Sequence, residues 1–285
     1  CEAYQISEIV DRTSINLNFN AHVKGAEIES TWEPVPGLRF NFAGGWEDAR
    51  LAKGDKAIDL IDRTAGHPGW VVMKPFVTQS SNCVFPDYVI ATLINIYANN
   101  GEGNASVSAC GFAYNNGIDP VAGGGPSYLA QAVAQGYPGY DPISPTATNN
   151  GYGPAPNNGA GFDKDLGGNE LPNAPPFTVS AGAQYTMPLS PDWAGTLRGD
   201  FYWQDNSWAR VFNDDPYDRL HGYKNFNLAV ILTSQSGWQV MLYDKNVFNT
   251  TAITGTFLNS DDSGLTTNIF LTDPKLIGIR VTKNW

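Results

Sequence analysis

The stretch Phe177-Thr178-Val179-Ser180-Ala181-Gly182-Ala183-Gln184-Tyr185-Thr186-Met187 alternates without interruption. Apolar residues occupy the odd positions, and small or polar residues occupy the even ones. A β-strand points successive side chains to opposite faces of its sheet. The stretch therefore predicts a strand with one apolar face and one polar face.

The same period of two recurs on both sides of this stretch, at 38–47, 196–204, 225–232 and 277–285. Soluble β-sandwiches also alternate, but their strands are usually about 5–6 residues long. A tilted strand needs about 9–11 residues to cross a bilayer, which is the length of these runs. Aromatic residues near the run ends suit the girdles of a membrane barrel. They are Trp46, Tyr185, Trp203, Trp238 and Trp285.

These patterns predict an all-β chain that forms part of an antiparallel transmembrane β-barrel with long extracellular loops. We expect about eight strands, near 2–10, 15–33, 38–53, 174–189, 195–210, 222–234, 237–250 and 273–285. Short connections alternate with long polar ones. The short ones are 34–37, 190–195 and 234–237, and the long ones are about 54–173, 211–221 and 253–272. If the C-terminus is periplasmic, every short connection falls in the periplasm and every long one outside, as in known membrane barrels.

Two positions depart from this pattern. Within 15–33, the apolar residues up to Val23 share one parity and Ile28 takes the other. A β-bulge near Lys24 and Gly25 would restore the order. Asp244 falls on the apolar side of its strand, where a carboxylate is costly at mid-bilayer and tolerated near the interface. We therefore expect Asp244 near the outer rim or beside another bulge.

The segment 54–173 is too long for an ordinary loop of a compact domain, and we expect it to form an extracellular cap. Apolar spacing permits short helices at 87–98 and 127–134. Cys83 and Cys110 lie in this polar, glycine-rich segment. A disulfide between them would staple the loop in an oxidising compartment, and two free thiols are the alternative.

The composition excludes several classes of protein. A net charge of −11 argues against nucleic acid as a partner, because phosphate binding needs clustered Lys and Arg. The sequence has no zinc-ligand spacing, phosphate loop or nucleophile elbow, so we expect no enzyme and no cofactor. Two acidic clusters in expected extracellular loops, Asp214, Asp215 and Asp218, and Asp261 and Asp262, could bind Ca²⁺. A solvated acidic loop is the plainer interpretation.

Four stretches resemble the C-terminal end of TonB-dependent outer-membrane receptors, of the kind abundant in sphingomonad-like bacteria. Residues 25–29 followed by 36–38 look like a strand–turn–strand segment of that family, and 168–175 looks like its re-entry into the membrane after a long loop. Residues 245–249 are similar to its Asn-Leu-Phe-Asp motif. Residues 273–285 resemble its closing strand with an aromatic last residue.

The resemblance implies a 22-stranded barrel with a plug domain that contacts TonB, of which 1–285 would be the C-terminal part without the plug. It places the protein in the outer membrane of a Gram-negative bacterium, among lipid and lipopolysaccharide. Gly278, Val281 and Trp285 would belong to the signal read by the barrel-assembly machinery. The implied function is the import of a scarce small-molecule nutrient, such as a siderophore, a vitamin or an oligosaccharide.

Candidate site residues follow from the same patterns. Lumen-lining residues are expected on the polar strand faces, at Arg198, Asp200, Tyr202, Gln204 and Arg280. A structural network of hydrogen bonds and ion pairs is the alternative role for them. Aromatic loop residues bury area with little loss of entropy. The ligand-contact candidates of this type are Tyr137, Tyr140, Tyr152 and Trp208.

Two other functions compete with import. One is a self-contained small outer-membrane barrel with a structural or adhesion role through its long loop. Its interior would be filled by side chains, and the loop would be the working part. The other is an outer-membrane enzyme, which would need a nucleophile beside a histidine or an acid at the rim. The sequence offers no such combination.

Overall fold

The computed structural model describes residues 17–73, 82–100, 148–259 and 264–285, with short pieces between 110 and 146. The chain divides into two compact units. Unit 1 is built around Lys56–Asp165, and unit 2 contains Phe19–Asp55, Leu166–Phe257 and Ile269–Trp285. No described helix is long and apolar enough to cross a membrane.

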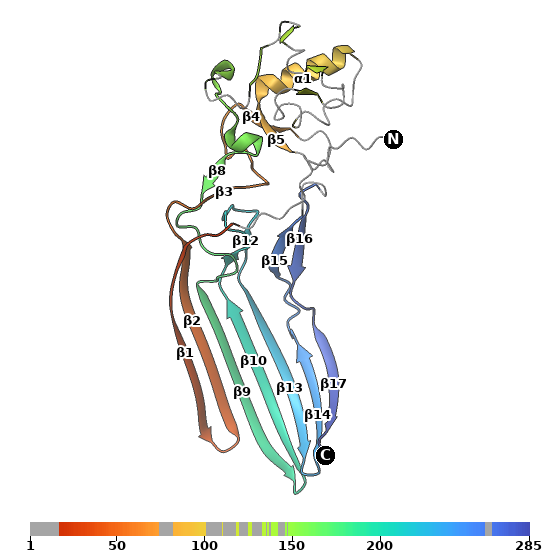
Figure 1. Ribbon diagram of the computed structural model, residues 1–285. Helices are drawn as coiled ribbons and strands as arrows, with labels where there is room; N and C mark the ends of the chain where they lie inside the picture. The colour runs from red at the N-terminus through yellow and green to blue at the C-terminus, as the bar shows by residue number, and fades with distance from the viewer. Residues whose placement is uncertain are drawn as a thin grey trace. The chain divides into compact units, whose positions relative to one another are not determined.

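Seven long strands form one antiparallel sheet in unit 2 (Figure 1). They are β1 (Ala21–Val35), β2 (Leu38–Leu51), β9 (Phe177–Ser190), β10 (Trp193–Gln204), β13 (Tyr223–Ser234), β14 (Trp238–Lys245) and β17 (Leu276–Lys283), paired in this order. The expected strand near 2–10 lies outside the described residues. The sheet is open, since β1 and β17 do not pair with each other.

The two faces of this sheet are chemically opposite. Register pairs Phe42 with Ala181, Ala181 with Phe201, and Phe201 with Phe226, so large apolar residues share one face. Much of this apolar face is exposed. It includes Ile28, Trp32, Phe40, Phe42, Phe177, Tyr185, Leu197, Leu228, Val230, Leu242, Ile277, Ile279 and Val281. A soluble sheet buries this face, whereas a sheet that faces lipid leaves it uncovered. The fold is therefore that of a transmembrane barrel wall, as the sequence predicts.

Three tight turns join the strand pairs β1–β2, β9–β10 and β13–β14 at the same end of the sheet (Figure 1). Gly37 adopts φ +83° in the first turn and Gly237 adopts φ +86° in the third, a conformation that glycine takes without strain. The carbonyl oxygen of Gly37 also accepts a hydrogen bond from Thr186 N of β9, at 2.8 Å. The first turn is therefore tied to the neighbouring strand.

The expected bulge near Lys24 and Gly25 is wrong. Pairing runs in continuous register from Ala21 opposite Leu51 to Trp32 opposite Phe40, and the irregularity lies between Trp32 and Val35. The prediction failed because it counted apolar residues before Ala21, where the chain is not yet a strand. Ala26, Ile28 and Trp32 lie on the apolar face without any shift in strand register.

Asp244 lies at the end of its strand, one residue before β14 finishes, as expected. Its carboxylate forms an ion pair with Lys275 Nζ at 3.1 Å. Lys275 immediately precedes β17, so the pair sits where two strands end. The charge on the apolar parity is thereby neutralised at the edge of the span.

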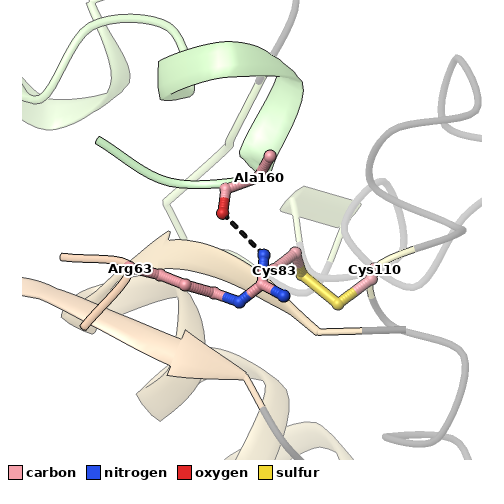
Figure 2. Close-up of a disulfide and its surroundings, with 4 residues drawn as sticks. All are labelled: Arg63, Cys83, Cys110 and Ala160. Atoms are coloured by element: carbon pink, nitrogen blue, oxygen red, sulfur yellow. Dashed lines mark hydrogen bonds between the residues drawn. A yellow bond between two sulfur atoms is a disulfide. The ribbon is translucent and has the colours of Figure 1, made fainter. Parts of the chain in front are cut away.

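Unit 1 has a small core stapled by a disulfide. Cys83 and Cys110 are bonded with their Cα atoms 5.7 Å apart, which confirms the predicted bridge (Figure 2). Both cysteines are buried and pack with three other buried residues, Met73, Phe85 and Val89. Phe85 belongs to β5 (Cys83–Pro86), which pairs with β4 (Trp70–Met73). Val89 belongs to α1 (Asp87–Asn100), which covers the expected helix at 87–98.

The two ends of the segment that forms unit 1 pair with each other. Strand β3 (Lys56–Ile58) is antiparallel to β8 (Asp163–Asp165), and Lys56 lies opposite Asp165. Arg63 Nη1 donates a hydrogen bond to the carbonyl oxygen of Ala160 at 2.9 Å, toward which its side chain points (Figure 2). Residues 97 positions apart in sequence are therefore joined near the entry and exit of this unit.

The remaining described elements are short. They are β6 (Ile118–Asp119), β7 (Gly125–Pro126), the 3₁₀ turns η3 (Asn149–Gly151) and η4 (Pro156–Gly159), β11 (Ser207–Trp208), β12 (Arg219–Leu220), β15 (Ile253–Leu258) and β16 (Thr267–Leu271). Strand β11 pairs with β12, and β15 pairs with β16. The β15–β16 hairpin falls within the connection expected at 253–272. Strand β12 falls within the connection expected at 211–221, but β11 lies in the strand expected at 195–210, because β10 ends at Gln204. Most of the second expected helix, at 127–134, lies outside the described residues.

Candidate functional site

The polar face of the sheet carries an ordered network centred on Arg198 of β10. Its Nε and Nη2 donate to the two carboxylate oxygens of Asp200, each at 2.8 Å, and its Nη1 donates to Gln184 Oε1 at 3.4 Å. Farther along the strand, the Tyr202 hydroxyl donates to Gln204 Oε1 at 3.0 Å. Four of the five residues expected to line a lumen therefore make hydrogen bonds on this face.

Arg280 of β17 lies on the same polar face, three strands away from Arg198. A depression of about 680 Å³ on unit 2 is lined by Arg198, Asp200, Tyr243 and Arg280 together with their neighbours. Across the sheet, Arg198 is opposite Ala229, and Ala229 is opposite Tyr243. Ala229 contributes only a methyl group between Arg198 and Tyr243. This cationic surface can contact an anionic or hydrogen-bonding partner.

The indole ring of Trp208 makes two contacts, and its role as a ligand contact stays a prediction. Its Nε1 donates to Glu170 Oε2 at 3.0 Å, and the Arg219 guanidinium lies 4.6 Å from the centre of its ring. The other oxygen of Glu170 pairs with Arg50 Nη2 at 3.2 Å. Trp208 thus belongs to a structural cluster at the end of the sheet opposite the tight turns.

Tyr140 and Tyr152 lie in unit 1, and Tyr137 is outside the described residues. Tyr140 packs edge-on against Phe85, with ring centres 5.6 Å apart. The Tyr152 hydroxyl donates to Asp87 Oδ1 at 3.1 Å, and this hydrogen bond raises the pKa of Tyr152. Both rings therefore hold the loop unit together, and their role as ligand contacts stays a prediction.

Tyr88 of α1 completes this aromatic group. Its ring lies 5.8 Å from that of Tyr152, and its hydroxyl donates to the carbonyl oxygen of Gly139 at 3.1 Å. Burial, and to a smaller extent the neighbouring Tyr152, raise the pKa of Tyr88 to about 12. The Tyr88 phenol therefore stays protonated at every physiological pH.

Asn246 is a structural residue whose role was not predicted from the sequence. It is 1% exposed and adopts φ +48°. Its Nδ2 donates to the carbonyl oxygens of Thr250 and Asp273, each at 2.9 Å, and its Oδ1 accepts from Thr250 N at 2.9 Å. Asn249 Oδ1 accepts from Lys275 N at 3.0 Å. The motif at 245–249 therefore ties the end of β14 to the start of β17.

A second asparagine pair holds two connections together. Asn169 Nδ2 donates to Val211 O at 2.9 Å, and Asn213 Oδ1 accepts from Glu170 N at 2.7 Å. The backbone N–H of Asn173 donates to Trp208 O at 2.8 Å. Polar stretches with frequent asparagine gave the only sequence signal for these contacts, because asparagine adopts positive φ and bonds to nearby backbone.

The described residues form no cluster suited to a metal ion. Among the described residues, no group of three His, Cys, Asp or Glu side chains could hold a metal ion. Asp218 is 1% exposed, and its Oδ1 accepts from Arg210 Nε at 2.6 Å. Asp261 and Asp262 lie outside the described residues. Ca²⁺ binding at these loops therefore remains an untested prediction.

The three residues assigned to the assembly signal differ in position and exposure. Gly278 and Val281 belong to β17, and Trp285 follows it. Val281 is exposed on the apolar face, and Trp285 is fully exposed. Lys283 Nζ lies 5.2 Å from the ring centre of Trp238 and 5.6 Å from that of Trp285. Gly278 lies on the polar face opposite Tyr243.

No protein-family model matches the sequence, and no curated protein matches it. Solved structures resemble it. The ferric yersiniabactin uptake receptor FyuA of Yersinia pestis is 10% identical, with a TM-score of 0.45 over 92% of this chain and 23% of its own. The siderophore receptor PiuA of Acinetobacter baumannii is 9% identical, with a TM-score of 0.44 over 92% of this chain and 21% of its own.

The ferric-catecholate import receptor Fiu of Escherichia coli K12 is 12% identical, with a TM-score of 0.34 over 92% of this chain and 27% of its own. The chain thus spans about a quarter of the length of each structure that it resembles. All three names are those of receptors, and none is that of an enzyme. None of the three sources is a sphingomonad.

Proposed function

We propose that the chain supplies barrel wall and extracellular loops to an outer-membrane receptor that imports a scarce small-molecule nutrient, driven by TonB. The observation that supports this proposal is the distribution of side chains on the two faces of the sheet, which is the reverse of that in a soluble protein. Its apolar face is exposed across seven strands, while its polar face holds Arg198, Asp200 and Gln184 in hydrogen bonds. Such a sheet is suited to lipid on one side and an aqueous or protein-filled lumen on the other.

The open edges of the sheet support a barrel larger than these seven strands. In the described sheet, β1 and β17 each have a neighbour on one side only. Unpaired backbone N–H and C=O groups are very costly in lipid, so a sheet that spans a membrane must close. Further strands must therefore pair with both edges, which agrees with the 22-stranded barrel that the resemblance implies. A plug domain in contact with TonB belongs to the same proposal.

The location and partners follow from this function. The protein would reside in the outer membrane of a Gram-negative bacterium, inserted by the barrel-assembly machinery and surrounded by lipid and lipopolysaccharide. The apolar band and the aromatic residues at its ends support this placement. The nutrient class is open among siderophores, vitamins and oligosaccharides, and no catalytic step is proposed.

A growth experiment in the native host tests the proposal. Cells lacking the full-length gene are compared with wild-type and TonB-inactivated cells, each limited in turn for iron, a vitamin or a carbohydrate. We expect deletion and TonB inactivation to impair growth on the same nutrient, and a plasmid copy to restore the deletion strain. Normal growth of the deletion strain under every limitation would contradict import and favour the small structural barrel.

A further inference from the structure

A second depression, of about 510 Å³, lies on unit 2 at the ends of β10 and β13 that are remote from the tight turns. Trp203 and Lys224 both line it and lie directly opposite each other in the strand ladder. Both occupy the parity of Leu197 and Phe201, which is that of the apolar face. The depression therefore opens at the lipid-facing rim of the sheet.

Its charge is unusual for this chain. Arg219, His221 and Lys224 line it, and no Asp or Glu does, although the sequence holds 28 acidic residues against 17 basic ones. In the part of the chain that the structure describes, neither Arg219 nor Lys224 forms an ion pair. The nearest carboxylate in sequence, Asp218, is buried against Arg210. Among the described residues, no carboxylate therefore pairs with either of these two cations.

The remaining lining suits a phosphate at the level of lipid headgroups. The hydroxyl group of Thr251 adds a hydrogen-bond donor, and the exposed imidazole of His221 adds a ring nitrogen. Tryptophan concentrates where acyl chains meet headgroups, and Trp203 sits at that boundary here. A guanidinium binds two phosphate oxygens through parallel N–H groups, and an ammonium binds as a point charge. Cationic, aromatic and hydroxyl side chains therefore line the same depression.

We propose that this depression binds the phosphate group of a lipid in the outer leaflet, held by Arg219 and Lys224 with Trp203 against the first part of the acyl region. The site rests on the outer-membrane location given in the proposed function. Trp203 and Lys224 lie on the opposite face of the sheet from Arg198 and Asp200, whereas Tyr223, which also lines the depression, has the parity of the polar face.

Lipid binding to the purified full-length receptor tests this site. The delipidated protein in detergent is titrated with diphosphorylated lipid A, with an acyl-matched lipid that lacks phosphate, and with inorganic phosphate. The variants are Arg219→Gln/Lys224→Gln and, as a matched control, Lys53→Gln. Lys53 is an exposed cation in a turn of unit 2 and does not line the depression. Heat-dependent gel mobility confirms that each variant is folded.

We expect phosphorylated lipid to bind more tightly than its phosphate-free counterpart. The double variant should lose roughly 30-fold in affinity for it, since each cation near an anionic lipid surface contributes about fivefold. The Lys53 variant should bind as the wild type does. Equal affinity for both lipids, or equal affinity of the wild type and the double variant, would overturn the site. Competition by millimolar inorganic phosphate with no preference for lipid would overturn the lipid source.

The growth experiment separates this inference from the function on which it rests. A receptor that imports its nutrient but shows no phosphate-dependent lipid binding would refute the site alone. A protein that supports no import yet binds the phosphorylated lipid through Arg219 and Lys224 would refute the transport role and leave the site standing.

Discussion

The phenol ring of Tyr243 covers Gly278 from the neighbouring strand. The two residues lie directly opposite each other in the β14–β17 ladder, on the polar face. A Cβ atom at position 278 would overlap the phenol oxygen and its ring carbon. A glycine inside a strand leaves backbone uncovered, and an aromatic ring packed across it compensates for the missing side chain. Gly278 therefore has a packing role that is independent of the assembly signal.

Replacing Gly278 with alanine should destabilise the barrel by about 1–3 kcal/mol, because the added methyl group displaces the Tyr243 ring. The midpoint of heat-induced loss of compact gel mobility, measured on the full-length receptor, should fall. Tyr243→Ala in the Gly278→Ala background should recover part of the loss by removing the overlap. A midpoint unchanged by Gly278→Ala would show that the ring moves freely and is not packed on the glycine.

Asn246 should be intolerant of substitution. Alanine removes the three hydrogen bonds that the buried Asn246 side chain makes to the backbone of Thr250 and Asp273. We expect the free energy of unfolding to fall by roughly 2–4 kcal/mol, since each hydrogen bond contributes about 0.5–1.5 kcal/mol net. Thermal midpoints of the full-length protein measure the loss.

Glycine at position 246 provides the matched control, because it accepts the positive φ of Asn246 but cannot make the bonds. Both variants should be similarly unstable. If Asn246→Gly were as stable as the wild type, backbone conformation rather than hydrogen bonding would explain the asparagine.

The Arg198–Asp200 pair should contribute little by itself. Its side chains are 42% and 35% exposed, and exposed ion pairs usually contribute about 0.2–1 kcal/mol. A double-mutant cycle with Arg198→Ala and Asp200→Ala, read from thermal midpoints, should give a coupling in this range that shrinks with added salt. A coupling of several kcal/mol that resists salt would mean that another part of the receptor buries the pair.

The disulfide should stabilise unit 1 without affecting the sheet. Closing a loop with a sequence separation of 27 residues stabilises a fold by about 3.5 kcal/mol through the unfolded state. The Cys83→Ser/Cys110→Ser variant should therefore be cut by trypsin within 56–165 faster than the wild type. Heat-dependent gel mobility of the barrel should not change. A lowered barrel midpoint would show that the two units unfold together.

Alkaline titration should reveal the buried phenol of Tyr88. Its pKa is raised by burial to about 12, above the ordinary value of 10.0. The protonated form is therefore favoured in the folded state, so this stabilisation is fully present below pH 10 and is lost as pH rises through 12. Phenolate absorbance should show one fewer high-pH ionisation in Tyr88→Phe than in the wild type. If the ionisation lost in Tyr88→Phe lay near pH 10 instead of near 12, this phenol would be in water.

The strands and their faces could be predicted from the sequence because alternation is local. Ile279 and Val281 fall on the apolar face whatever the rest of the chain does, and register follows once one face must meet lipid. Strand ends were less accurate. The strand expected to reach 250 stops at Lys245, since Asn246 adopts positive φ and directs its side chain to the backbone of Thr250.

The interior of unit 1 and the roles of the aromatic residues could not be predicted. The hydrogen bond between Arg63 and Ala160 joins residues 97 positions apart, and no local period records such a contact. The hydrogen bond from the Trp208 ring nitrogen to Glu170, 38 positions away, is of the same kind. Polar residues in loops are specified by distant partners, so the sequence predicted that the loop was stapled but not how it packs.

Strands β2 and β9 are neighbours in the sheet although unit 1 intervenes between them in sequence. The chain leaves at Asp55 and returns at Leu166, whose N–H donates to Asp55 O at 2.9 Å. The segment 56–165 leaves and rejoins the sheet at one point, so another segment can replace it without changing the pairing of β2 with β9. Descendants of such a gene can therefore acquire new external surfaces by recombination between these two residues while inheriting an unaltered wall.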